Sequence, residues 1–174
     1  MSVLAIANNY KNSMNRTLTD AVERWSLPSP GFIKLNVDAA FHVDIGAGDT
    51  VAVLRDVRGN FIAAQCLYIE RGTDVVTMEA TIMRDGLILA NSLGFRNVEA
   101  ESDSIQVINS CSSQTRWWDA ATAIFAECVN MSTSIGKVKF KYCPRMTNGV
   151  AHEIAKFSFL NKNSVSWIDR KSVV

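Results

Sequence analysis

The chain has 174 residues, of which 48% are hydrophobic, so a single domain with a proper core is expected. Lysine and arginine number 18 and aspartate and glutamate 17, and the formal net charge of +1 excludes a global positive field for nucleic acid. Any basic surface must therefore be local. Four scattered cysteines without metal-ligand spacing argue against a zinc site or a disulfide framework, and reduced thiols fit the cytoplasm or the nucleus.

The first 24 residues show no strong hydrophobic period and are expected to form a flexible extension. Lys11 and Arg16 precede the first acid of this segment, Asp20, which weakly favours an organelle transit segment, so organelle import stays open. No apolar run is long enough to span a bilayer, so no membrane is expected as a partner. We expect one domain over residues 25–162 and a C-terminal tail over 163–174.

Alternating apolar and polar residues predict the first strand over residues 32–41. Its polar face carries Lys34, Asn36 and Asp38, and Asp38 leaves that face at the strand end. Strands are also expected over 50–56 and 60–69, joined as a hairpin.

A long helical pattern follows this hairpin and ends at Gly94. The remaining pattern predicts a strand over 98–103, helices over 105–111 and 118–131, and a strand over 137–143. A last helix then carries His152, and Thr147 or Asn148 can be its N-cap. The order βββαβααβα predicts an α/β fold with a five-stranded mixed sheet and helices packed on it.

Three further residues are placed to meet Asp38. Glu79 borders the buried stripe of its helix, where a carboxylate needs a cation or hydrogen-bond donors. Asp103 closes the fourth strand, and His152 lies near the start of the last helix. Acids that leave strand ends beneath a helix are typical of a cation site.

The order of the sequence blocks resembles the plant family of ribonuclease-H-like domains, which is related to bacterial ribonuclease H and to the RNase H domains of reverse transcriptases. Each block alone is weak, and the resemblance depends on all of them standing in order from about Trp25 to Phe159. The blocks are WSLPSPG (25–31), IKLNVD (33–38), LRDVRGN (54–60), TMEA (77–80) with GLILA (86–90), ESDS (101–104) and PRMTNGVAH (144–152).

The resemblance implies a catalytic site in which Asp38, Glu79 and Asp103 hold two Mg²⁺ or Mn²⁺ ions against the scissile phosphate. Two ions about 4 Å apart can activate the attacking water and neutralise the leaving oxygen. The products would be a 3′-hydroxyl and a 5′-phosphate. No other small-molecule cofactor is expected, and Glu101 is a candidate to support the metal site from behind.

The fourth position departs from the bacterial pattern, which has Asp where this chain has His152. A neutral imidazole is a softer ligand than a carboxylate and favours Mn²⁺ relative to Mg²⁺. Three readings of His152 stay open: a metal ligand, a proton carrier for product departure, or a bystander on the helix surface.

Local positive charge gathers around the last strand, where a plain solvated strand face is the alternative to a binding surface. The residues expected to contact nucleic acid are Lys137, Lys139, Lys141, Arg145 and Asn148.

Bacterial relatives carry a basic, tryptophan-rich loop that grips the DNA strand, whereas this chain has SCSSQTRWWDA (110–120) with one Arg and no Lys. Double-stranded RNA is therefore a substrate candidate beside an RNA/DNA hybrid.

These features predict a divalent-metal-dependent endoribonuclease that cuts RNA within a double helix, with a role against viral or retroelement RNA as one expectation. The alternative is a catalytically inactive, retroelement-derived module that binds nucleic acid or protein, because loss of the fourth acid would accompany decay.

Overall fold

The computed structural model describes residues 25–112 and 121–169. They form one six-stranded sheet with the strand order β5-β4-β1-β2-β3-β6. Strands β1, β2 and β3 are antiparallel neighbours, while β4 and β5 continue the sheet in parallel with β1. The strands are β1 (Ile33–His42), β2 (Ala47–Arg55), β3 (Phe61–Ile69), β4 (Asn97–Ser102), β5 (Lys137–Tyr142) and β6 (Val165–Ile168).

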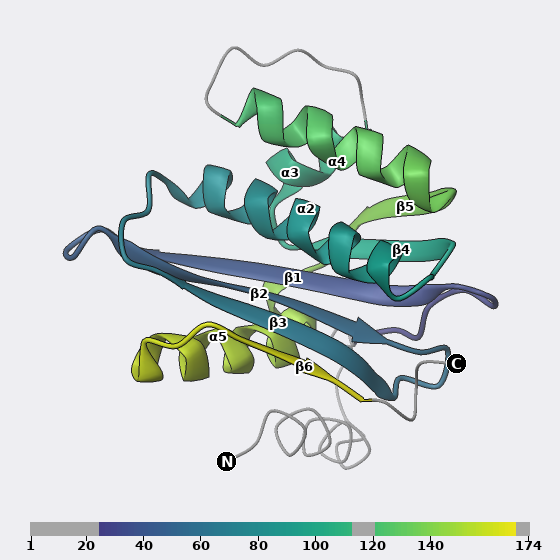
Figure 1. The fold of residues 1–174 in the computed structure, drawn as a ribbon, viewed down its shortest axis with the longest axis horizontal. Helices are drawn as coiled ribbons and strands as arrows, with labels where there is room; N and C mark the ends of the chain where they lie inside the picture. Colours follow the sequence, from purple (N-terminus) through teal and green to yellow (C-terminus); the bar gives the residue numbers. More distant parts are fainter. Residues whose placement is uncertain (1–24, 113–120, 170–174) are drawn as a thin grey trace.

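Helices cover both faces of this sheet. Figure 1 shows α2, α3 and α4 on one side and α5 on the other. The helices are α2 (Val75–Ser92), α3 (Ile105–Ser112), α4 (Thr122–Ile135) and α5 (Gly149–Asn161), and the short 3-10 helix η1 (Arg145–Asn148) precedes α5. The predicted mixed α/β fold and its five strands are confirmed.

The sheet has one strand more than predicted. Strand β6 lies within the segment that was expected to be a tail, and it pairs antiparallel with β3. Its four residues are too few to give a clear alternation, but Val165 and Trp167 pack against the apolar cluster under α5. The strand is therefore stabilised by tertiary contacts that a local pattern does not contain.

Two helix boundaries also differ from the prediction. Helix α4 continues to Ile135, and its predicted start at 118 lies outside the described residues. Thr147 does not cap α5: its hydroxyl donates to the carbonyl of Pro144 at 2.7 Å and closes η1.

Helix α2 packs directly on β1 because Gly86 allows a close approach. A Cβ at Gly86 would lie 2.8 Å from Cδ1 of Leu35, closer than such atoms pack. Asp74 is the N-cap of α2 and accepts a hydrogen bond from the Thr77 backbone N–H at 2.9 Å. The cap and the close contact together fix where Glu79 projects from the first turns of the helix.

The core therefore has two layers. Leu35, Val37 and Leu54 belong to the layer under α2 and α4, and Val51 and Val53 belong to the layer under α5. None of the helices in the described ranges is long and apolar enough to cross a membrane.

Candidate active site

Asp38 lies on a central strand and meets His152 from the helix on that side of the sheet. Strand β1 pairs with β2 on one side and β4 on the other, and Asp38 is buried. His152 Nδ1 lies 3.3 Å from Asp38 Oδ2, although the two residues are 114 positions apart in sequence. The predicted proximity of these two residues is confirmed.

Asn148 fixes this approach. Its Nδ2 donates to the carbonyl of Val37 at 2.7 Å, which ties η1 to β1 next to Asp38. His152 then follows one turn later on α5 and reaches the carboxylate. Asn148 is only 1% exposed, so the expected direct contact with nucleic acid is not supported by this structure. Its side chain positions the strand instead.

Asp38, Glu79 and Asp103 lie close enough to perturb one another electrostatically. Burial raises the pKa of Asp38 to about 6, with the charge of Asp103 acting in the same direction and the contact with His152 opposing it. Burial also raises the pKa of Glu79 to about 7; a hydrogen bond with Ser104 opposes the rise, whereas the charges of Asp103 and Asp38 add to it. We call Asp38, Glu79 and Asp103 the acid cluster.

Register explains how these elements bring the acids together. In the parallel pairing of β1 with β4, Asn36 lies opposite Glu101. Asp38 and Asp103 each follow two residues later, so both leave the sheet at the same end.

Arg145 is the cation of this site. It is exposed at the start of η1, and its positive charge lowers the pKa of both Asp38 and Glu79. The sequence predicted Arg145 as a nucleic-acid contact, and the structure places its charge near two acids of the cluster.

The donor chemistry of the acid cluster fits a hard divalent cation. Carboxylate oxygens are the ligands that such ions prefer, and the pKa values of Asp38 and Glu79, which burial raises, would be lowered by a cation bound beside them. Within the described ranges, however, no three His, Cys, Asp or Glu side chains stand arranged to hold a metal ion. The ligand set is present, but a finished coordination geometry is not.

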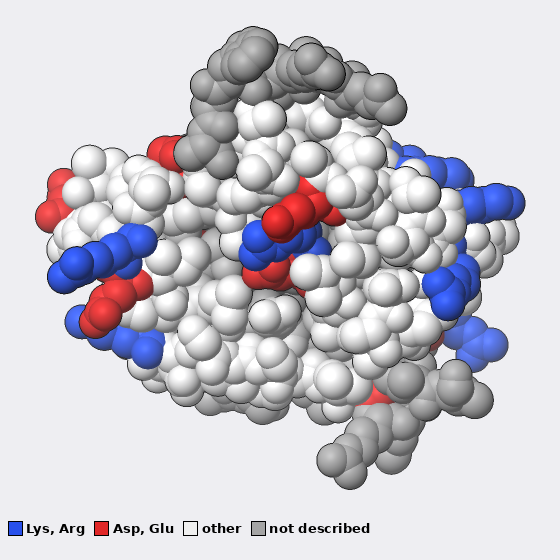
Figure 2. Space-filling model, turned by 45° about the horizontal axis from the view of Figure 1, so that its top comes forward, with Lys and Arg blue, Asp and Glu red and all other residues white. Residues whose placement is uncertain are grey.

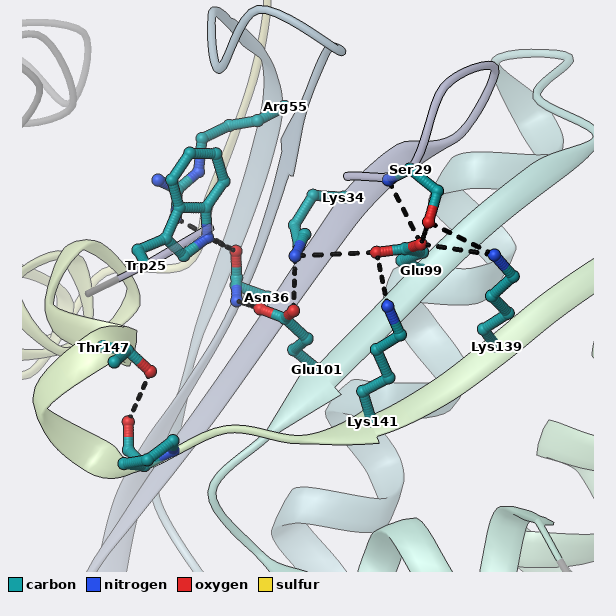
Figure 3. Close-up of polar contacts among 11 residues, drawn as sticks. Trp25, Ser29, Lys34, Asn36, Arg55, Glu99, Glu101, Lys139, Lys141 and Thr147 are labelled. Carbon is teal, nitrogen blue, oxygen red and sulfur yellow. Dashed lines mark hydrogen bonds and ion pairs between the residues drawn. The ribbon is translucent and has the colours of Figure 1, made fainter. Parts of the chain in front are cut away.

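A second group of buried side chains, three charged and one an amide, lies near the acid cluster and is drawn in Figure 3. We call it the charge network, and its members are Lys34, Asn36, Glu99 and Glu101. Lys34 is fully buried and forms ion pairs with Glu99, at 3.7 Å, and with Glu101. Asn36 Nδ2 donates to the other oxygen of Glu101 at 2.9 Å. Glu101 was a candidate to support the metal site, and its described bonds are to these two residues instead.

The lysines of β5 are partly neutralised by the same network. Lys139 and Lys141 lie 3.5 Å and 3.1 Å from the oxygens of Glu99. Both ammonium groups remain partly exposed, while Lys137 makes no ion pair with any described residue. The expected basic strip therefore exists, but with less net charge than three free lysines would give.

Asp49 is a further buried acid of the same sheet face that the sequence pattern did not predict as part of the site. It lies opposite Ala40 in the β1–β2 pairing, and its carboxylate is 3.3 Å from His42 Nε2. Burial raises the pKa of Asp49, and the hydrogen bond with His42 opposes that rise. Asp49 lies two and four residues before the buried Val51 and Val53, so it shares their strand face. This spacing could have shown from the sequence that Asp49 is buried.

The face of the molecule that carries α2 and α4 has few charges. Figure 2 shows it mostly white, with charged atoms in one central group and at the sides. Arg84 joins the two helices through an ion pair with Glu127 of α4 at 3.0 Å, and it also pairs with Asp85 of its own helix at 2.8 Å. Most of the 110–120 segment, including both of its tryptophans, lies outside the described residues, so its predicted lack of a grip on DNA is not tested.

A family model described as reverse transcriptase-like matches residues 36–158, which includes every member of the acid cluster. The chain belongs to the reverse transcriptase-like family. The resemblance to the RNase H superfamily is confirmed by this match and by solved structures. No curated protein matches the chain.

Solved RNase H structures share the fold of this reverse transcriptase-like chain. RNase H1 from Halobacterium salinarum is 21% identical with a TM-score of 0.68, covering 76% of this chain and 99% of its own. The N-terminal RNase H domain of a Mycobacterium tuberculosis protein is 17% identical with a TM-score of 0.69, covering 75% and 94%. LC11-RNase H1 in complex with an RNA/DNA hybrid is 18% identical with a TM-score of 0.67, covering 75% and 97%.

Proposed function

We propose that this protein is a divalent-metal-dependent endoribonuclease that cuts RNA within a double helix. The observation that carries the proposal is the meeting of Asp38, Glu79, Asp103 and His152 from four separate elements on an RNase H fold. Acids with raised pKa values in one place are costly for the fold, and such a cost is typical of functional sites.

The acid cluster would hold two Mg²⁺ or Mn²⁺ ions through its carboxylate oxygens. Bound there, the ions would activate water and neutralise charge on the leaving oxygen. Asp38 is the best candidate for a shared ligand because it lies on β1, which is hydrogen-bonded to β4 on one side and to β2 on the other. Arg145 adds a positive charge that can attract the scissile phosphate.

His152 holds Asp38 through Nδ1, and its ring is partly exposed. This contact argues against the reading of His152 as a mere bystander. We favour a role for His152 as a fourth metal ligand beside Asp38. The alternative is that its ring carries a proton for product departure.

The substrate class follows from the fold and the distribution of charge. LC11-RNase H1, which shares the fold, has a crystal structure in complex with an RNA/DNA hybrid. The strip of Lys137, Lys139 and Lys141 supplies few phosphate contacts, so binding would be weak and would fall only modestly with salt. We therefore propose that the enzyme accepts double-stranded RNA as well as a hybrid. Residence in the cytoplasm or nucleus and a role against viral or retroelement RNA stay predictions.

A single-turnover assay tests the proposal with labelled hybrid, double-stranded RNA and double-stranded DNA, each with Mg²⁺, Mn²⁺ or a chelator. We expect metal-dependent cutting of both RNA-containing duplexes at rates within about tenfold, a barrier difference of about 1.4 kcal/mol, and no cutting of DNA. A hybrid preference of about a hundredfold would overturn the proposed substrate range. No cutting under any condition would favour the inactive binding module.

A further inference from the structure

A pocket of about 410 Å³ lies beside the acid cluster, between the segment that precedes β1 and the turn from β5 into η1. Its lining includes Trp25, Glu101, Lys141, Tyr142, Pro144 and Thr147. Glu101 is 7% exposed and lies deep, whereas Tyr142 is 51% exposed and lies at the rim. The volume is within the range of pockets that hold small organic groups.

The deep carboxylate of this pocket is held in place. Lys34 and Asn36 each donate to a different oxygen of Glu101. Each carboxylate oxygen has a second acceptor position, so Glu101 can still accept hydrogen bonds from a ligand. Because both partners are buried with it, the carboxylate is fixed before any ligand arrives.

The aromatic wall of the pocket is fixed in the same way. Trp25 Nε1 donates to Asn36 Oδ1 at 3.0 Å, and the Arg55 guanidinium lies 4.1 Å from the ring centroid. Figure 3 shows Trp25 beside Arg55, with Thr147 below the indole and Glu101 and Lys141 to its right. An oriented indole that lines the same pocket as a carboxylate suits a flat ligand that carries N–H donors.

Three chemical features of the pocket coincide in a nucleotide. A base could stack on Trp25 or Tyr142, its edge with N–H donors could donate to Glu101, and a phosphate could pair with Lys141, whose side chain is partly exposed. Guanine suits the carboxylate best because its ring N–H and its amino group point the same way. A base in a duplex has this edge occupied by its pairing partner, so the occupant must be unpaired.

The place of the pocket links it to the cleavage site. Glu101 precedes Asp103 by two residues, and Pro144 and Thr147 flank Arg145. We propose that this pocket binds one unpaired nucleobase of the RNA strand next to the cleavage site, with guanine preferred. The inference rests on the proposed function and narrows its substrate to duplexes that carry an overhang or a bulge.

Binding measurements on Asp38→Asn protein test the pocket without cleavage. Affinities for a short blunt RNA duplex and for the same duplex with one unpaired guanosine would be compared by fluorescence anisotropy at fixed salt. We expect the unpaired guanosine to tighten binding by about fivefold or more, the smallest gain typical of stacking one base. A uridine in its place should give less.

Variants connect this gain to the pocket. Tyr142→Ala should reduce the ratio between the two affinities toward one, and Glu101→Gln should remove the preference for guanosine over uridine. Ile88→Ala, on a 43% exposed position of α2, is the matched control and should keep the ratio.

Equal affinity for the two duplexes would contradict the proposal that this pocket binds a base. A ratio of the two affinities that Tyr142→Ala leaves unchanged would contradict it as well. If wild-type protein cuts duplexes but an unpaired guanosine does not tighten binding, only the base-binding pocket is refuted. If an unpaired guanosine tightens binding but the wild-type protein cuts no duplex, only the proposed nuclease activity is refuted.

Discussion

Two groups of carboxylates lie near each other, the charge network on β1 and β4 and the acid cluster at the ends of these strands and on α2, and their environments affect them in opposite ways. In the charge network, burial alone would raise the pKa of Glu99, but hydrogen bonds from Ser29 and Lys141 outweigh it and hold the pKa at about 2. In the acid cluster, burial and the charge of Asp103 raise the pKa of Asp38 to about 6. The network satisfies its own charge, whereas the cluster needs positive charge from outside. Perturbed pKa values cluster at functional sites, so this difference makes the acid cluster the candidate for a metal site.

The largest expected effect is on catalysis. Asp38→Asn should lower the single-turnover rate by roughly 1000-fold or more, because it removes the shared ligand of the cluster. The far-ultraviolet circular dichroism should stay that of the wild type. Asp85→Asn, which removes an ion pair on α2 outside the site, is the matched control and should keep the rate. Undiminished cleavage by pure Asp38→Asn would contradict the site.

The next effect concerns the stability of the network. Lys34→Met should lower the free energy of unfolding by about 3 kcal/mol, because Glu101 and Glu99 lose their buried cation. Lys137→Met removes an exposed cation from β5 and should change stability by less than about 0.5 kcal/mol. Urea unfolding at neutral pH measures both, and similar midpoints for the two variants would show that the network is not a stabilising unit.

These two groups also show how far sequence patterns reach. The period of two in β1 correctly placed Asp38 on the polar face, because that information lies within a few neighbouring residues. The same period could not show that Lys34 is fully buried, since Glu99 and Glu101 are more than sixty positions away. Asn148 was read as a surface contact for the same reason: its partner, Val37, is 111 positions away. Strand β6 was missed because its stability comes from packing under α5.

A smaller effect should appear in the pH dependence of stability without metal. The raised pKa of Asp38 means that its stabilising contribution is present below about pH 4 and is lost as the pH rises through about 6. Asp38→Asn does not ionise, so at pH 7.5 it should exceed the wild type in free energy of unfolding by about 2 kcal/mol. The excess should shrink toward zero near pH 4. An excess that does not vary with pH would mean that Asp38 is not held in an unfavourable charge environment.

The smallest effect concerns the choice of metal. His152→Asp should raise the Mg²⁺-supported rate more than the Mn²⁺-supported rate, changing their ratio by about threefold, because a carboxylate is the harder ligand. Single-turnover rates with each ion measure the ratio. An unchanged ratio would show that His152 is not a ligand, and the reading as a proton carrier would replace it.

The most direct test of the difference between the two groups is the effect of Mn²⁺ on thermal unfolding. An ion that binds only the folded protein raises the midpoint with concentration. We predict that Mn²⁺ raises the midpoint of the wild type by several degrees, has little effect on Asp38→Asn, and still stabilises Lys34→Met. An equal rise in the wild type and Asp38→Asn, or none in either, would contradict a cation site at the acid cluster.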